Sequence, residues 1–151
     1  MIHEEICTYE VCKLAKEKGF PQAFNYTHFK SGLDYYNHKG ELNGDVGDIL
    51  KLRIKHNPVP EEMKPITAPT KSLLQRWLRE ERGIVVEVIA QPTCSTSKKN
   101  CYWWSVKQNS NGFCYQYEEC SYLLYSDEGY FDTYELALED ALKYALEHLI
   151  Q

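Results

Sequence analysis

The chain has 151 residues, of which 43% are apolar and 26% charged, a balance typical of one soluble domain rather than of a disordered or fibrous chain. Its 17 basic and 22 acidic residues give a formal net charge of −5, which argues against a constitutive nucleic-acid binder. The longest stretch without Asp, Glu, Lys or Arg covers residues 19–29, far short of the roughly 18 apolar residues of a membrane span. Because acids stand where a secretory signal has basic residues, we expect a cytoplasmic protein with no membrane partner.

The first part of the sequence predicts one helix followed by an aromatic hairpin. Thr8 can cap a short helix that runs through Lys18, and Gly19 supplies its left-handed stop. Between residues 20 and 57, the runs AFNYTHF, LDYY and ILKLRIKH predict two or three strands, the last from its alternation of apolar and polar residues. The proline-rich residues 58–66 can continue neither helix nor strand and are predicted to be a linker.

The second part predicts the order helix, strands, helix. Leucines and a tryptophan at helical spacing predict a helix over residues 70–82. Strands are expected at residues 84–90, 101–108, 113–117 and 120–125. A last helix over residues 133–149 is predicted to begin with Asp132 as its N-cap and Glu135 as the second half of a capping box.

These elements predict one α+β domain over residues 1–151. We expect an antiparallel sheet of three to five strands or more, with the two main helices packed on one face. Residues 67–151 carry the α-β-β-β-α order, and the N-terminal residues 1–57 are expected to extend or cover the sheet.

Six cysteines stand at positions 7, 12, 94, 101, 114 and 120. In a chain without an export signal we expect free thiols, since an unpaired cysteine behaves as a small buried hydrophobe. The alternative is a metal site, formed by the later four cysteines or by His3, Cys7 and Cys12. Structural zinc sites usually take two ligands from one tight C-x2-4-C turn. Cys7 and Cys12 reach only the loose end of that range and the later four cysteines miss it, so no metal ligand and no cofactor is predicted.

Three stretches carry a resemblance to known proteins: LAKEKGF near the start, APTKSLLQRWLRE in the middle and FDTYELALEDALKYAL near the end. They are similar, in the same order, to segments of small uncharacterised proteins of gut Bacteroidales and their phages and other mobile elements. The resemblance covers about half of the chain and implies a phage or mobile-element origin. Its motifs specify helix boundaries and packing, and they imply no site residues.

One possible function is nucleic-acid binding. Double-stranded RNA-binding domains share the element order of residues 67–151, and the basic segment 67–108, of net charge +4, includes Lys98 and Lys99 in the loop that would reach across the minor groove. Those domains place basic residues at the start of the last helix. Here that helix begins with acids, inside a segment (109–151) of net charge −8, so nucleic acid is the less favoured partner.

A second possible function is that of a small enzyme with a thiol nucleophile, since cysteines occur together with His28, His38 and His56. No local pattern marks a cysteine as activated, and no glycine-rich phosphate loop, H-E-x-x-H or G-x-S-x-G motif occurs. We therefore predict no catalytic residue.

The favoured function is binding of another protein, or of a second copy of the chain, through exposed aromatic side chains of the sheet. Neighbouring residues of a strand point to opposite faces, so part of an aromatic-rich set must face away from the two helices, unless residues 20–57 cover it. Large apolar surface on a soluble protein usually marks an interaction site. The candidate interface residues are Tyr102, Trp103, Trp104, Tyr115, Tyr117, Tyr122 and Tyr125.

Overall fold

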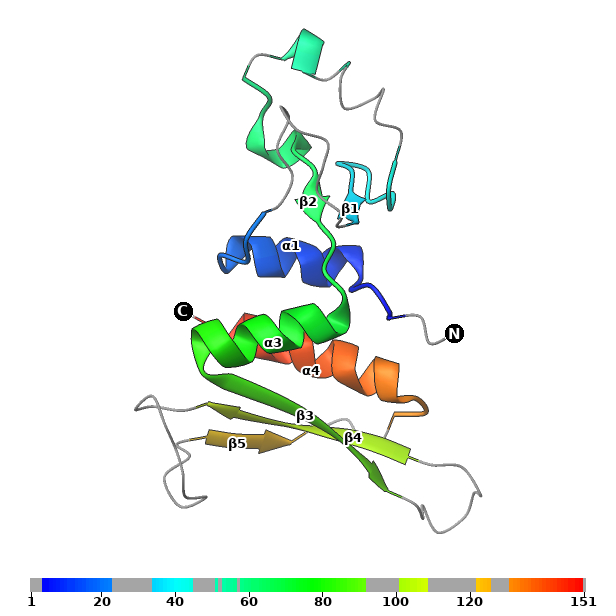
Figure 1. Ribbon diagram of the computed structural model, residues 1–151, viewed down its shortest axis with the longest axis vertical. Helices are drawn as coiled ribbons and strands as arrows, with labels where there is room; N and C mark the ends of the chain where they lie inside the picture. The colour runs from blue at the N-terminus through cyan, green and yellow to red at the C-terminus, as the bar shows by residue number, and fades with distance from the viewer. Residues whose placement is uncertain are drawn as a thin grey trace. The chain divides into compact units, whose positions relative to one another are not determined.

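The computed structural model (Figure 1) divides the chain into two compact units. It describes residues 4–22, 34–44, 51, 53–56, 58–91, 101–108, 122–125 and 131–150. Unit 1 comprises Met1–Glu5 and Lys71–Gln151, and unit 2 comprises Ile6–Thr70, which is thus inserted into the sequence of unit 1. The predicted single domain with a linker at 58–66 stays a prediction; the boundary between the compact units falls after Thr70.

Unit 1 contains two helices and a three-stranded antiparallel sheet in the order β3-β4-β5. Its elements are α3 (Lys71–Arg82), β3 (Ile84–Gln91), β4 (Cys101–Gln108), β5 (Tyr122–Tyr125) and α4 (Tyr134–His148). Both helices lie on the same face of the sheet (Figure 1). The α+β class, the two main helices and the antiparallel strands are therefore confirmed, whereas the strand predicted at 113–117 lies outside the described residues.

Helix α3 packs through the apolar stripe that its spacing predicts. Leu74 and Leu78 are fully buried and Trp77 is nearly so. The helix ends at Gly83, whose φ of 65° lies in the left-handed region that glycine adopts without strain. The chain then enters β3 directly, because Ile84, buried beneath the helices, is its first residue.

Helix α4 begins one residue later than the sequence analysis places it. The N-cap is Thr133, whose hydroxyl accepts a hydrogen bond from Leu136 N at 3.2 Å, so the prediction of Asp132 as N-cap is wrong. Phe131 still forms a backbone bridge with Tyr102, which keeps the chain extended up to this point. Asp and Thr are both good N-caps, so the sequence alone could not choose between them.

Unit 2 consists of one helix and a small sheet. Its elements are α1 (Tyr9–Glu17), β1 (Tyr35–Tyr36), the 3-10 helix η1 (Glu61–Met63) and β2 (Ile66–Thr67). Thr8 is the N-cap residue of α1, although its side chain makes no capping hydrogen bond, and Gly19 has the expected positive φ of 89°. Both ends of the predicted N-terminal helix are confirmed.

The aromatic hairpin is only partly as predicted. Tyr35 and Tyr36, in the LDYY run, form strand β1, but they pair with Thr67 and Ile66 of β2, at the end of the segment predicted as a linker. The AFNYTHF run lies outside the described residues.

The strand prediction for ILKLRIKH is wrong, because residues 51 and 53–55 are helical. A half-buried strand needs one covered face, and Ile54, which the alternation would place on that face, is 86% exposed. Leu, Lys and Arg are also better helix formers than strand formers. No helix in the described parts of the chain is long and apolar enough to cross a membrane.

We predict that Leu142→Ala lowers the free energy of unfolding by about 3 kcal/mol, because Leu142 is fully buried in α4 and the substitution leaves a cavity. Leu136→Ala is the matched control: this leucine of the same helix is 56% exposed, and its loss should change stability by less than about 0.5 kcal/mol. Urea unfolding followed by circular dichroism measures both. Equal effects of the two substitutions would contradict the packing of α4.

Candidate functional site

Trp104, one of the predicted interface residues, belongs to the core. It is 2% exposed, its Nε1 donates to Asp140 Oδ2 at 2.7 Å, and its ring centroid lies 5.1 Å from that of Tyr144. Both partners are residues of α4, so Trp104 faces the helices. The prediction that it contributes to an interface is wrong, because the strand register places it under α4.

Trp103 occupies the opposite face of the sheet from Trp104, as alternation requires. It is half-buried and lies opposite Ile89 of β3, which is 37% exposed. Only one of the two adjacent tryptophans is therefore buried under the helices.

Tyr102 lies next to the beginning of α4. Its ring packs edge-to-face against Tyr134, with centroids 6.3 Å apart and an interplanar angle of 89°. Tyr134 is 40% exposed. Tyr102 and Tyr134 lie on the helix side of the sheet, whereas Trp103 and Ile89 lie on the other side. We refer to these four residues together as the aromatic end of unit 1. Ile89 and Tyr134 were not among the predicted interface residues. The signal for Tyr134 was its place in the first turn of the last helix, apart from the buried residues of that helix.

The remaining interface candidates are either placed by their backbone alone or lie outside the described residues. Tyr122 and Tyr125 lie in β5, where their backbone positions are opposite Gln108 and Ser105. Tyr115 and Tyr117 lie outside the described residues, as do the candidate nucleic-acid contacts Lys98 and Lys99.

The basic residues of segment 67–108 that the structure describes are all in contact with acidic or aromatic side chains. Arg76 Nε lies 2.9 Å from Glu80 Oε1, and Arg79 contacts the same carboxylate at 3.7 Å. Further contacts join Lys107 to Glu87, Arg82 to the ring of Trp77, and Lys71 to Glu5 and Glu139. The positive charge that favoured a nucleic-acid partner is thus largely compensated within unit 1.

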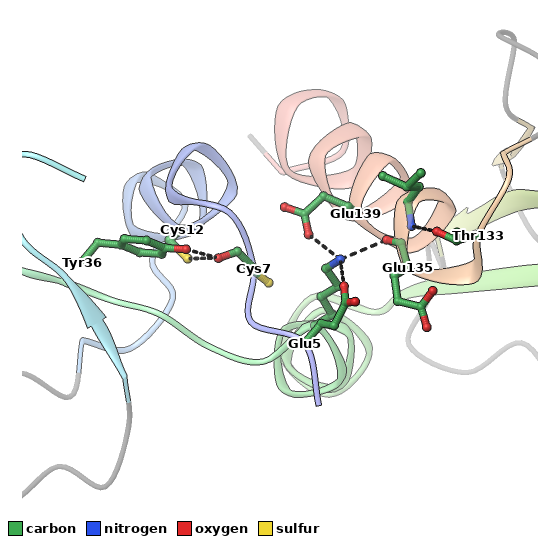
Figure 2. A network of polar contacts seen from close by, with 9 residues as sticks. Glu5, Cys7, Cys12, Tyr36, Thr133, Glu135 and Glu139 are labelled. Atoms are coloured by element: carbon green, nitrogen blue, oxygen red, sulfur yellow. Dashed lines mark hydrogen bonds and ion pairs between the residues drawn. The ribbon is translucent and has the colours of Figure 1, made fainter. Parts of the chain in front are cut away.

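Lys71, the first residue of α3, is a buried cation surrounded by acceptors (Figure 2). Its Nζ lies 2.8 Å from Glu5 Oε2, 3.3 Å from Glu139 Oε2 and 3.1 Å from the backbone oxygen of Glu135. Its backbone N–H also donates to Glu5 O at 2.9 Å. One ammonium thereby links the segment before unit 2, the start of α3 and the first turns of α4. The side chain of Glu139 is only 16% exposed, so this carboxylate is largely buried.

The environment of Lys71 excludes a role as a neutral nucleophile. Burial by itself lowers the pKa of its ammonium, but the hydrogen bond to Glu5 and the charge of Glu139 outweigh burial and raise the pKa above 10.5. A lysine that forms covalent adducts needs a lowered pKa. Lys71 therefore acts as a structural cation.

A second ionic cluster lies in unit 2. Glu61 of η1 is 2.8 Å from Lys16 of α1 and also pairs with Lys64. Hydrogen bonds from Lys16 and then Lys64 lower the pKa of Glu61 to about 2. Such a carboxylate stays ionised at neutral pH and cannot serve as a general acid.

Cys7 and Cys12 are free thiols with no exposed surface. Cys12 Sγ donates to the backbone oxygen of Cys7 at 3.5 Å, and the Tyr36 hydroxyl donates to the same oxygen at 3.0 Å (Figure 2). Buried thiols in such surroundings are inert. Neither is placed to attack a substrate.

Cys101 is disulfide-bonded, so the prediction that all six cysteines are free is wrong at this position. Disulfide formation depends on the geometry of two cysteines brought together by the fold, which the spacing of cysteines in the sequence does not give. Cys94, Cys114 and Cys120 lie outside the described residues. Within the described ranges, no group of three His, Cys, Asp or Glu side chains is arranged to hold a metal ion.

Unit 1 also contains an open pocket of about 690 Å³ at the C-terminal ends of its two helices. Its lining includes the buried Ile84 and side chains of both charges. Glu81, Arg82, Ile84, Gln108, His148, Leu149 and Ile150 line it.

No protein-family model, no curated protein and no solved structure matches this chain. The resemblance to small proteins of Bacteroidales phages and mobile elements therefore stays a prediction.

We predict that Lys71→Met destabilises the protein by about 3 kcal/mol, because it leaves the buried Glu139 without its cation. Arg76→Ala, which breaks the exposed pair with Glu80, should cost less than about 1 kcal/mol. Because the folded pKa of Lys71 exceeds 10.5, its contribution is complete below that pH and is lost as the pH rises through the folded pKa. Denaturant titrations from neutral to alkaline pH should show this loss in the wild type and not in Lys71→Met.

We also predict that alkylation separates the described cysteines into two classes. In the native protein Cys7 and Cys12 should resist iodoacetamide, because both are fully buried, and should react once denaturant is added. Cys101 should react only after reduction as well as denaturation. Peptide mass spectrometry reads each site, and labelling of Cys101 without reductant would refute the disulfide.

Proposed function

We propose that the protein is an interaction module of phage or mobile-element type, which binds another protein or a second copy of itself through the aromatic end of unit 1. The observation that carries the proposal is the exposure of Ile89 beside Trp103 on one face of the sheet, and of Tyr134 beside Tyr102 on the other. Tyrosine and tryptophan dominate the binding energy of protein interfaces, since they bury large areas with few rotatable bonds.

Binding is favoured over catalysis by the state of the reactive side chains. Cys7 and Cys12 are buried, Cys101 is disulfide-bonded, and Lys71 is held as a cation by carboxylates. Among the described residues, none of these groups combines exposure with an activated protonation state, which nucleophilic catalysis requires.

Nucleic-acid binding is less supported than protein binding. Lys71 and Lys107 are largely buried against carboxylates, and Arg76 shares Glu80 with Arg79. A polyanion would have to compete with these carboxylates for each contact.

A cytoplasmic location remains part of the proposal, with one observation against it. Disulfides persist mainly in oxidising compartments, and Cys101 is in a disulfide. A cytoplasmic location therefore predicts that Cys101 is reduced in protein that is alkylated as it is isolated from cells.

We predict that Trp103→Ala and Tyr134→Ala each weaken association of the full-length protein by about 30-fold, the cost typical of a central interface aromatic. The association measured is that of the protein with itself or with a partner purified from its host. Leu136→Ala is the matched control, because it removes an exposed apolar side chain of α4 outside the aromatic end. Sedimentation velocity and titration calorimetry measure the dissociation constants, and thermal melts verify folding. Unchanged affinity in both aromatic variants would refute the proposed surface.

A further inference from the structure

The outer edge of β3 carries backbone groups that point away from the sheet. Tyr102 and Phe131 exchange both backbone hydrogen bonds, at 3.0 and 2.7 Å, so Tyr102 directs its N–H and C=O away from β3. In an antiparallel ladder the direction of the backbone N–H and C=O groups alternates along each strand. Two directly opposed residues direct these groups either toward each other or both away from each other. Ala90, which lies opposite Tyr102, therefore directs its backbone groups away from β4, and so do Val88 and Val86.

One side chain occupies this edge. Gln75 of α3 donates from Nε2 to Val86 O at 2.7 Å, a contact that only an outward-pointing carbonyl can make without displacing a ladder bond. Among the described strands, β3 has a hydrogen-bonded neighbour on one side alone, since the sheet order is β3-β4-β5. Exposed strand edges pair readily with other chains, and proteins commonly cover them.

We propose that the outer edge of β3 is a pairing surface for a second copy of this chain, and that Gln75 keeps it closed by occupying Val86 O. This surface consists of backbone groups of β3, and Ile89 is the residue that it shares with the aromatic end on which the proposed function rests. Release of the Gln75 amide opens the edge, and two chains then pair antiparallel through β3.

The residues of β3 favour a second copy as the occupant. An antiparallel pair of identical strands closes on itself by a two-fold axis, so one surface supplies both halves of the interface. With the axis at Val88, the Ala90 N–H of each chain reaches Val86 O of the other. In this register Glu87, the single charged residue of β3, lies opposite Ile89 of the second copy, so like charges do not meet.

Charge compensation inside each chain supports the same pairing. Glu87 already has its counter-ion, because Lys107 Nζ on the neighbouring strand contacts Glu87 Oε2. Pairing through β3 therefore brings together β-branched residues and a neutralised carboxylate. Such cross-strand neighbours stabilise an antiparallel sheet.

The test first removes the side-chain amide of Gln75, which occupies Val86 O. It then removes the backbone N–H of Ala90, which would bind Val86 O of the second copy. Gln75→Ala frees Val86 O in both chains of the dimer. We expect the association constant of the dimer to rise by about fivefold for each freed oxygen, the value of one net hydrogen bond. Gln108→Ala is the matched control, because Gln108 also donates its amide to a backbone oxygen, that of Leu149 at 3.2 Å, but away from this edge. It should leave the dimerisation constant at the wild-type value.

Ala90→Pro in the Gln75→Ala background removes the N–H that reaches Val86 O of the other chain. Proline is tolerated where an edge-strand N–H faces outward, and Ala90 is exposed near the end of β3. We expect this double variant to return to the wild-type dimerisation constant in sedimentation equilibrium, and the Val88 and Ala90 amides of Gln75→Ala to gain exchange protection as its concentration rises. Association caused by partial unfolding would instead increase in the double variant.

The proposal is overturned if Gln75→Ala associates no more tightly than the wild type, or if Ala90→Pro leaves its association intact. Loss of association in Trp103→Ala, with no response to Ala90→Pro, would assign self-association to the aromatic end and remove β3 from it.

Discussion

The antiparallel ladder between β3 and β4 determines the direction of every side chain and backbone group in the larger part of unit 1's sheet. Its register sets Val106 and Trp104 on the face under the helices, where both are almost completely buried. The same register puts Trp103 and Ile89 on the other face. Because side chains alternate strictly along a strand, a shift of one residue would exchange the two tryptophans and place the polar face under α4.

The buried ammonium of Lys71 is the second constraint on unit 1. Hydrophobic packing of Leu74, Leu142 and Leu146 is non-directional, so by itself it leaves α3 and α4 free to slide. The contacts of Lys71 with Glu5 and Glu139 are directional, and they tie the chain just before unit 2 to the chain just after it. Removal of the Lys71 ammonium leaves a buried carboxylate without its counter-ion, which lowers the free energy of unfolding strongly. The attraction itself contributes little net free energy, because burying the charges opposes it.

The distribution of charge explains why a binding surface can exist on a chain with so many ionic side chains. The described cations of segment 67–108 lie against carboxylates or, for Arg82, over the ring of Trp77. This pairing leaves the aromatic end and the edge of β3 with little net charge of their own. A surface of that kind suits a protein partner, since desolvating an unpaired charge would oppose association.

The sequence by itself determined helices α1, α3 and α4, strands β3, β4 and β5 and the left-handed stop at Gly19, because these depend on local periodicity, capping and glycine conformation. It also determined that the adjacent tryptophans must face opposite sides. Tertiary structure decided which of them is buried, through the register of β4 against β3 and the position of Asp140. It also decided the helical state of residues 53–55, the pairing of β1 with β2 and the disulfide at Cys101. Each of these depends on contacts or buried faces supplied by residues distant in the chain, for which local propensity holds no information.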